Sequence, residues 1–134
     1  VEEALKQVSS FSTRLGWTTP DQLFGSIDML VVPSIAPESF GLVVAEAMSA
    51  RIPVIVSDAG ALAEVVGGES YPYIVSAGQS LDLAAAIKTL GEELRENSSS
   101  LAERTSDLFW RWQENYSPEA GKARVGEILE RFAR

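Results

Sequence analysis

The chain has 134 residues, and 46% of them are hydrophobic, which is typical of one folded domain rather than of a disordered chain. Its net charge of −8 weighs against nucleic-acid binding, because that role needs a basic surface. It contains no Cys and no His, so it has no disulfide or thiolate chemistry and lacks the commonest general base and metal ligand.

The expected elements alternate between short strands and helices. The first half predicts a helix over 2–8, a weak strand over 11–17, a helix over 20–27 opened by Pro20, a strand over 28–33 and a helix over 41–50. The second half predicts a strand over 53–57, a short helix over 61–66, a strand over 71–75 and an amphipathic helix over 80–94. A serine-rich linker at 97–100 leads to closing helices within 101–134, over 101–115 and 118–133.

Two of the expected strands are continuous apolar runs, Met29-Leu30-Val31-Val32 and Pro53-Val54-Ile55-Val56. Continuous runs are typical of parallel strands that are buried on both faces. Because such strands alternate with helices here, we predict an α/β fold, a Rossmann-like parallel sheet flanked by helices. We expect residues 1–134 to form a single domain. No apolar run reaches membrane-spanning length and no signal peptide is visible. The absence of Cys suits a cytosolic protein, and we expect a cytoplasmic one.

Glu38 and Glu46 belong to the most informative stretch. Glu38 follows the strand over 28–33 in a short loop, and Glu46 lies within the helix over 41–50, among apolar neighbours. A helix that is apolar on every face is a buried helix, and a buried glutamate needs a polar partner. The nearby sequence offers no obvious cation for Glu46. This predicts that Glu46 binds a polar group from elsewhere.

The loop over 33–41 lies at the carboxyl end of an expected strand, where α/β sheets bind ligands. It also leads into a helix N-terminus, whose N–H groups and dipole favour phosphate. Gly41 lets a ligand approach the backbone closely. If wholly helical, residues 38–46 would span roughly 12 Å, which suits a nucleotide diphosphate with an acid near each end.

Glu38-Ser39-Phe40-Gly41, followed by Glu46-Ala47-Met48, resembles the E-x7-E signature of retaining glycosyltransferases with the GT-B fold. The resemblance runs from about Gly16 to Leu90 and implies the C-terminal, donor-binding half of that fold, truncated at its N-terminal side. Other matching features are Pro33-Ser34, the run Pro53-Val54-Ile55-Val56, and Gly60 to Glu64 in the place of the family's glycine-rich turn and glutamate.

The resemblance implies a role for each matching residue. Glu38 is the expected catalytic residue, which contacts sugar hydroxyls close to the reacting carbon, and Glu46 is expected to bind the ribose. The implied donor-binding residues are Glu38, Ser39, Phe40, Gly41, Leu42 and Glu46, with Gly16 and Trp17 at a strand end near the nucleobase.

The implied activity is retaining hexosyl transfer from a nucleotide diphosphate sugar to an acceptor hydroxyl. The resemblance implies no metal and no cofactor. The family's acceptor-binding N-terminal domain, and an upstream Arg and Lys that contact the diphosphate, have no counterpart here. The chain starts without Met, so we expect a piece of a longer enzyme that is inactive alone. Membrane association of the longer protein stays open.

Three positions depart from the family's pattern. Arg51 stands where the family often has Gly at a helix end, and a left-handed backbone there would strain an Arg. Ala61 replaces the second Gly of the turn, which would narrow access for the donor sugar. The segment 71–73 lacks the usual Gly before its strand.

Plainer interpretations stand beside these. Glu38 is otherwise a solvated loop acid near a helix N-terminus, and Glu46 a partly exposed acid at the edge of a packed helix. Glu64 either orients the turn or caps local structure. Trp110 and Trp112 lie on different helix faces, which favours packing over a stacking platform for bases. Two other functions remain, a GT-B sugar-nucleotide epimerase domain and a non-catalytic Rossmann-like interaction module.

Overall fold

Three parallel strands form the centre of the molecule in the computed structural model, which describes residues 2–133. The strands are β1 (Leu30–Val32), β2 (Val54–Ser57) and β3 (Ile74–Val75), in the order β1-β2-β3. Leu30 pairs with Val54 and Val56 pairs with Ile74, both in parallel register. Since all three strands point the same way, their carboxyl ends meet at one edge of the sheet.

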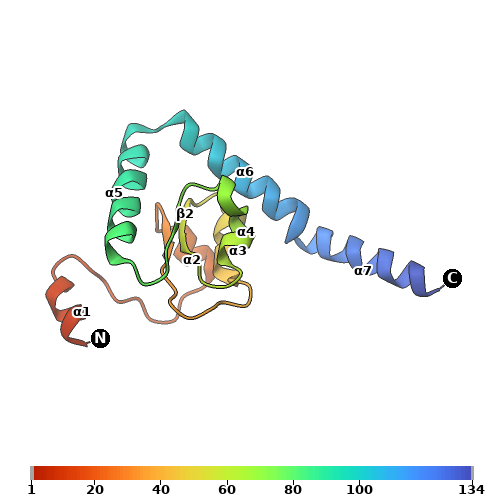
Figure 1. The fold of residues 1–134 in the computed structure, drawn as a ribbon, viewed down its shortest axis with the longest axis horizontal. Coiled ribbons are helices and arrows are strands. Elements are labelled where there is room, and N and C mark those ends of the chain that lie inside the picture. Colours follow the sequence, from red (N-terminus) through yellow and green to blue (C-terminus); the bar gives the residue numbers. More distant parts are fainter. Residues whose placement is uncertain (1, 134) are drawn as a thin grey trace.

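Helices cover both faces of this sheet (Figure 1). Helices α3 (Leu42–Ser49) and α4 (Leu62–Val66) pack on one side, and α5 (Ser80–Glu96) packs against β2 and β3 on the other. Every residue of β2 is buried as a result. This explains why its sequence is a continuous apolar run, and it confirms the predicted α/β class.

The last helix forms an arm that extends from the body of the molecule (Figure 1). Helix α6 (Ser99–Asn115) packs along α3, whereas α7 (Pro118–Phe132) extends away from the body beyond the end of α6. Ser117 begins α7, since its hydroxyl accepts a hydrogen bond from the Ala120 amide at 3.1 Å. Helix α6 thus contributes Leu101 and Leu108 to the core of the body, and α7 forms the arm.

The strand predicted over 11–17 is wrong. This segment is irregular, and no strand among residues 2–133 pairs with it. Phe11, Leu15 and Trp17 are all exposed, so the segment gains neither ladder hydrogen bonds nor burial of its apolar side chains. It connects α1 (Glu2–Val8) to α2 (Pro20–Phe24), which is shorter than the helix predicted over 20–27.

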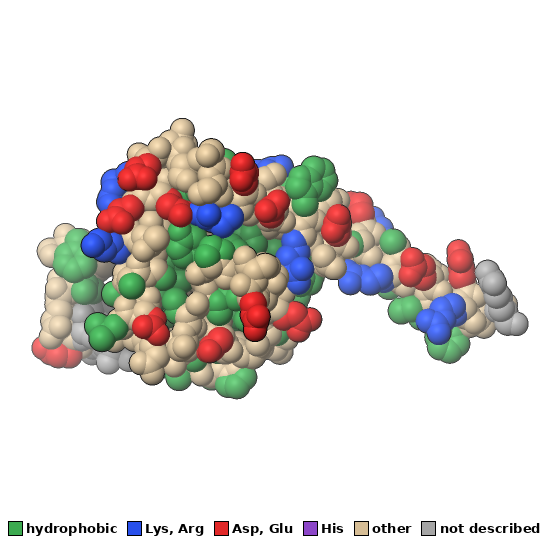
Figure 2. Space-filling model, turned by 45° about the horizontal axis from the view of Figure 1, so that its top comes forward, with side chains coloured by type: hydrophobic (Ala, Val, Ile, Leu, Met, Phe, Trp, Pro, Cys, Tyr) green, Lys and Arg blue, Asp and Glu red, His purple; other side chains and the backbone are tan. Residues whose placement is uncertain are grey.

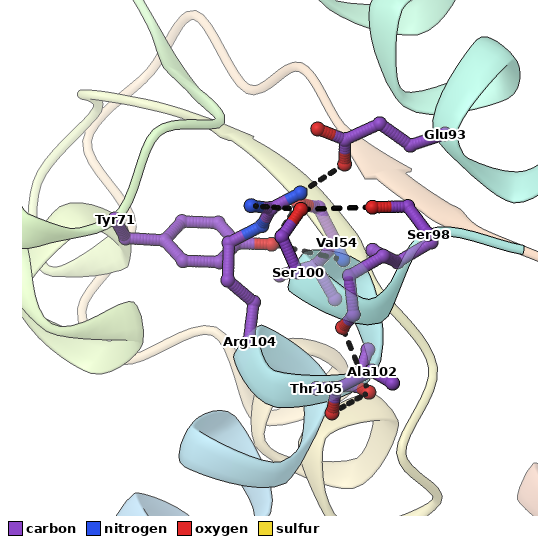
Figure 3. A network of polar contacts seen from close by, with 9 residues as sticks. Val54, Tyr71, Glu93, Ser98, Ser100, Ala102, Arg104 and Thr105 are labelled. Atoms are coloured by element: carbon purple, nitrogen blue, oxygen red, sulfur yellow. Dashed lines mark hydrogen bonds and ion pairs between the residues drawn. The ribbon is translucent and has the colours of Figure 1, made fainter.

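The predicted linker over 97–100 is a well-fixed corner (Figure 3). Asn97 ends α5 in the left-handed conformation, with a φ of 50°, and α6 already begins at Ser99. Ser98 and Ser100 share a hydrogen bond, and Arg104 bonds Ser100 while forming an ion pair with Glu93 on α5. Side-chain contacts thus fix a turn that composition alone marks as flexible.

Tyr71 clamps the amino end of β2 (Figure 3). Its buried hydroxyl donates to the carbonyl oxygen of Val54 at 2.6 Å and accepts from the Val54 amide at 3.3 Å. Its ring meets that of Tyr73 edge to face, with centroids 6.0 Å apart. Burial raises the pKa of both Tyr71 and Tyr73 to about 12. In this segment, which lacks the Gly expected from the family pattern, the two tyrosines stabilise the start of β2 by hydrogen bonding and ring packing.

The surface carries the net negative charge over much of its area. On the face shown in Figure 2, acidic side chains are spread over the body and the arm, and Lys and Arg side chains lie between them. None of the helices within residues 2–133 combines the length and the apolarity needed to cross a membrane.

Candidate functional site

The loop over 33–41 joins β1 to α3 at the carboxyl edge of the sheet. Its last residue, Gly41, has a φ of +85°, which L side chains rarely adopt. A Cβ there would also lie 2.4 Å from the Leu62 side chain. Gly41 is therefore required both by its backbone conformation and by the close packing of α4 against the start of α3.

The backbone of Glu38 is locked to the turn that follows β2. Its amide donates to the carbonyl oxygen of Ala59 at 3.3 Å, and its own carbonyl accepts from the amide of Ala61 at 2.9 Å. Gly60 lies between these two bonds, and a Cβ on it would lie 2.3 Å from the Glu38 carbonyl oxygen. Gly60 thus allows two loops from neighbouring strands to touch through their backbones.

Two serines also hold this loop. The Ser34 hydroxyl donates to the Oε1 atom of Glu38 at 2.8 Å, and the Ser57 hydroxyl donates to the Ser34 carbonyl oxygen at 2.6 Å. Neither serine is among the functional residues that the sequence predicts. Ser57 carries a usable signal, since it is a polar residue at the end of an otherwise apolar strand.

The loop presents a row of backbone amides without protein acceptors. Among residues 2–133, none of the five amides from Ser39 to Val43 donates a hydrogen bond. The first satisfied amide of the helix is that of Val44, which donates to the Gly41 carbonyl at 2.9 Å. Successive amides around a left-handed Gly at a helix N-terminus form a concavity that suits phosphate.

The side chain of Phe40 points inward. Its ring packs edge to face on Tyr116 at the end of α6, with ring centroids 5.2 Å apart. This contact anchors the loop to the end of α6. Leu42 is exposed in the first turn of α3, and Ser39 is exposed in the loop.

Glu46 lies on a half-buried side of α3. The helix buries Val44 and Ala47 but leaves Leu42 64% exposed, so the expectation of a helix buried on every face is wrong. The reason is that the sheet and α6 cover only part of its surface. The side chain of Glu46 borders a cavity of about 320 Å³ between α2 and α3, lined by Pro20, Asp21, Phe24, Gly25, Glu46, Ser49 and Ala50.

Gly16 and Trp17 precede α2, whose residues form the other wall of this cavity. They lie in an irregular segment rather than at a strand end, which corrects the predicted position, because the strand over 11–17 does not form. Trp17 is fully exposed, so its indole ring has no fixed packing against the rest of the domain. The segment leads directly into α2 beside the Glu46 cavity, but neither Gly16 nor Trp17 forms a hydrogen bond with Glu46 within residues 2–133.

Asp58, the residue after β2, holds a third loop at the same edge. One of its carboxylate oxygens accepts from the Ala77 amide at 2.8 Å, in the loop between β3 and α5. A cleft of about 230 Å³ lies beside these loops, lined by Pro33, Ile35, Ser57, Val75, Ser76, Gly78, Gln79, Ser80 and Leu83. The three loops that follow the three strands are thus tied to one another.

Of the three departures from the family pattern, Arg51 is strained and Ala61 is not. Arg51 has a φ of 58°, and its guanidinium carbon lies 4.1 Å from the centre of the Phe109 ring. A cation–π contact with α6 therefore accompanies the unfavourable backbone. Ala61 has a φ of −79°, which any residue adopts.

Glu64 has a structural contact through its backbone, and whether its side chain orients the turn or caps local structure stays a prediction. Glu64 is exposed on α4, where its carbonyl oxygen accepts from Arg111 at 2.7 Å. Arg111 of α6 also donates to the carbonyl of Val65, so it caps the end of α4. Trp112 packs on the core while Trp110 is exposed, which confirms that they lie on different faces of α6.

No group of three or more acidic residues within the described part of the chain is arranged to hold a metal ion. The expectation of a metal-free and cofactor-free reaction stays a prediction. What the site offers chemically is one oriented carboxylate, a row of amides and a second carboxylate beside a cavity.

Comparison with known proteins identifies the class. Residues 2–106 match the family described as Glycosyl transferases group 1, and the chain belongs to this family. A phosphatidyl-myo-inositol mannosyltransferase of Mycobacterium leprae is 41% identical over 73 residues, 53% of this chain and 20% of that protein. A D-inositol 3-phosphate glycosyltransferase of Paenarthrobacter aurescens is 33% identical over 92 residues, 67% of this chain and 22% of that protein.

A third relative is an uncharacterized glycosyltransferase of Methanocaldococcus jannaschii, 43% identical over 58 residues, 41% of this chain and 15% of that protein. The matched part of the chain thus spans between 15% and 22% of the length of these curated relatives. The comparison confirms the glycosyltransferase family expected from the E-x7-E resemblance. The match covers only part of the length of these relatives.

Proposed function

We propose that this chain is the donor-binding part of a retaining glycosyltransferase with the GT-B fold. The whole enzyme would transfer a hexose from a nucleotide diphosphate sugar to an acceptor hydroxyl. The observation that carries this proposal is the row of five unpaired amides over Ser39–Val43, directly beside the oriented carboxylate of Glu38. Amides favour the negative charge that develops on a departing diphosphate, and they need no reorganisation to do so.

Each end of the site would bind one part of the donor. Glu38 would accept hydrogen bonds from sugar hydroxyls near the reacting carbon, while the amides of Phe40, Gly41 and Leu42 would bind the sugar and the distal phosphate. Glu46 would accept the ribose hydroxyls, with the nucleobase over Gly16 and Trp17. Support for this division comes from the cavity beside Glu46, which lies about one helical turn beyond the start of α3, on the far side of the amides from Glu38 in the sequence.

Binding is tested by titrating the 134-residue chain with nucleotide diphosphate sugars and recording backbone amide NMR shifts. We expect shifts at residues 39–43 and at Glu46, and we expect Glu46→Gln to weaken binding about tenfold, since a hydrogen bond to a charged group contributes ~1.5 kcal/mol. Glu119→Gln, on α7 and far from the site, is the matched control. Shifts confined to α6 and α7 would instead support the interaction module.

Catalysis is tested in the full-length protein that contains this chain. We expect sugar transfer with retained anomeric configuration, and a large loss of kcat in Glu38→Gln. Conversion of the nucleotide sugar without any acceptor would identify an epimerase. Sugar transfer by the isolated 134 residues would contradict the proposal that the acceptor site and the remaining phosphate ligands lie outside this chain.

A further inference from the structure

Ser57 is a buried hydroxyl at the end of a strand that is otherwise apolar. It is 1% exposed, and β2 is buried at every position. A buried hydroxyl needs a hydrogen-bond partner, and that of Ser57 is the carbonyl oxygen of Ser34, 2.6 Å away. The bond connects the core strand to the loop over 33–41 at the point where this loop leaves β1.

Ser34 connects this anchored backbone to the side chain of Glu38. Its hydroxyl donates to one carboxylate oxygen of Glu38 at 2.8 Å. The Glu38 side chain is exposed and has three rotatable bonds, so without a partner its carboxylate would sample several positions. A hydrogen bond to a charged acceptor favours one of them and leaves the second oxygen to bind a ligand.

The backbone of Glu38 is already fixed by other contacts. Its amide and carbonyl are bonded to Ala59 and Ala61 on the neighbouring turn. What these bonds leave undetermined is the direction of the side chain, and the contact that the structure gives the carboxylate is Ser34. The backbone bridge and the two serines therefore restrict different degrees of freedom of the same residue.

We infer that Ser57 and Ser34 are positioning residues for the carboxylate of Glu38. Ser57 holds the backbone of Ser34, and the hydroxyl of Ser34 holds the carboxylate in the position where it meets the sugar. This inference rests on the proposed function, because it assigns the serines to the sugar-binding acid. Preorganised groups are more effective in catalysis than groups that must be ordered during the reaction.

The test uses the full-length protein that contains this chain, assayed for sugar transfer from a nucleotide diphosphate sugar. Ser34→Ala should lower kcat about tenfold, equivalent to ~1.4 kcal/mol, with the KM for the donor little changed. Ser34→Thr keeps a hydroxyl and should recover most of the rate. Ser57→Ala should lower kcat by a smaller factor, since it acts through Ser34. Ser70→Ala removes a comparable hydroxyl-to-carbonyl bond on η1 (Gly68–Ser70) and should leave the rate unchanged.

The double variant shows whether the two serines act in sequence. If they do, Ser34→Ala with Ser57→Ala should be no slower than Ser34→Ala alone, because neighbours in one chain of contacts are not additive. Multiplying effects, or a wild-type kcat in Ser34→Ala, would overturn the inference.

Crystal structures separate this inference from the proposed function. Glu38 should occupy one conformer in the wild type and in Ser34→Thr, and several in Ser34→Ala. A single unchanged conformer in Ser34→Ala would contradict the positioning role, whatever the activity. A wild-type protein that transfers no sugar, but whose Glu38 loses its single conformer in Ser34→Ala, would overturn the proposed function and support the positioning role.

Discussion

A side-chain hydroxyl forms hydrogen bonds at each end of β2, but its partners differ between the two ends. At the amino end, the phenol of Tyr71 bonds both the N–H and the C=O of Val54, and all three groups are buried. At the carboxyl end, the buried hydroxyl of Ser57 holds an exposed loop, which ends in a carboxylate and a row of unpaired amides. At the amino end, the polar groups are hydrogen-bonded inside the domain. At the carboxyl end, the amides over Ser39–Val43 and one Glu38 carboxylate oxygen have no hydrogen-bond partner within residues 2–133.

Stability and ligand binding are therefore assigned to opposite ends of one strand. Buried polar groups that are fully paired stabilise a fold and offer nothing to a ligand. The loops at the carboxyl end are just as well fixed in their backbones, yet five amides and a carboxylate oxygen remain open. Substitutions at the amino end should therefore change stability alone, and substitutions at the carboxyl end should change both stability and donor binding.

The largest effect is expected for Gly60→Ala. The added methyl group would lie 2.3 Å from the Glu38 carbonyl, at a φ of +67°. We expect a loss of about 3 kcal/mol in the free energy of unfolding, and loss of donor binding as the loop moves. Gly68→Ala is the matched control, because its φ is also +67° but nothing lies within 4 Å of the new methyl group.

Urea denaturation measures both variants, and Gly68→Ala should lose about 1 kcal/mol from backbone strain alone. Equal losses would show that the contact between Gly60 and Glu38 is not tight in solution. Donor binding that survives in Gly60→Ala would show that the loop does not depend on its bridge.

At the amino end, Tyr71→Phe should lower the free energy of unfolding by about 2 kcal/mol, since it leaves both polar groups of Val54 without the hydroxyl. Donor affinity should stay at the wild-type value. Tyr116→Phe is the control, because that hydroxyl forms no hydrogen bond within residues 2–133, and it should change stability by less than about 0.5 kcal/mol. A weaker donor affinity in Tyr71→Phe would break the proposed separation of the two ends.

The same tyrosine predicts a pH dependence. Burial raises the pKa of Tyr71 from 10.0 to about 12, so between these values the folded state keeps a proton that the unfolded state loses. Its contribution to stability is fully present below pH 10 and is lost as the pH rises towards 12. Between pH 9 and pH 11 the wild type should lose about 1 kcal/mol more than Tyr71→Phe does. Parallel curves in urea denaturation would show that Tyr71 is not buried as a neutral phenol.

The smallest effect concerns Arg51, away from both ends of β2. Arg51→Ala keeps the strained φ of 58° and loses the contact with Phe109, so it should be destabilised by about 1 kcal/mol. Arg51→Gly loses the contact but also the strain, and should stay within about 0.5 kcal/mol of the wild type. If Arg51→Ala has a higher melting temperature than Arg51→Gly, backbone strain at this position is negligible.

Much of the fold follows from local patterns. Continuous apolar runs predict β1 and β2, because strands buried on both faces need no polar side. Pro20 and Pro118 mark the starts of α2 and α7 because proline suits the first turn of a helix. The segment over 11–17 fails for the opposite reason, since a strand depends on a partner that its own residues do not specify.

The candidate site divides in the same way. The spacing of Glu38, Gly41 and Glu46 is written in the sequence, because a strand, a loop and a helix N-terminus follow one another along the chain. The sequence does not predict the hydrogen bond between Glu38 and Ala61 or the one between Ser57 and Ser34. These contacts join residues from different βα units, which meet only in the folded chain.

By itself, then, the sequence determined the order of most strands and helices, and it placed an acid and a glycine after a strand and a second acid in the helix that follows. Tertiary structure alone decided the direction of the Glu38 carboxylate, the inward turn of Phe40 onto Tyr116, and the one-sided burial of α3 that leaves Glu46 beside a cavity. The physical reason is the distance along the chain over which each interaction acts. Periodicity and capping act within a few residues, whereas hydrogen bonds across the sheet edge and packing of the closing helices exist only after distant segments meet.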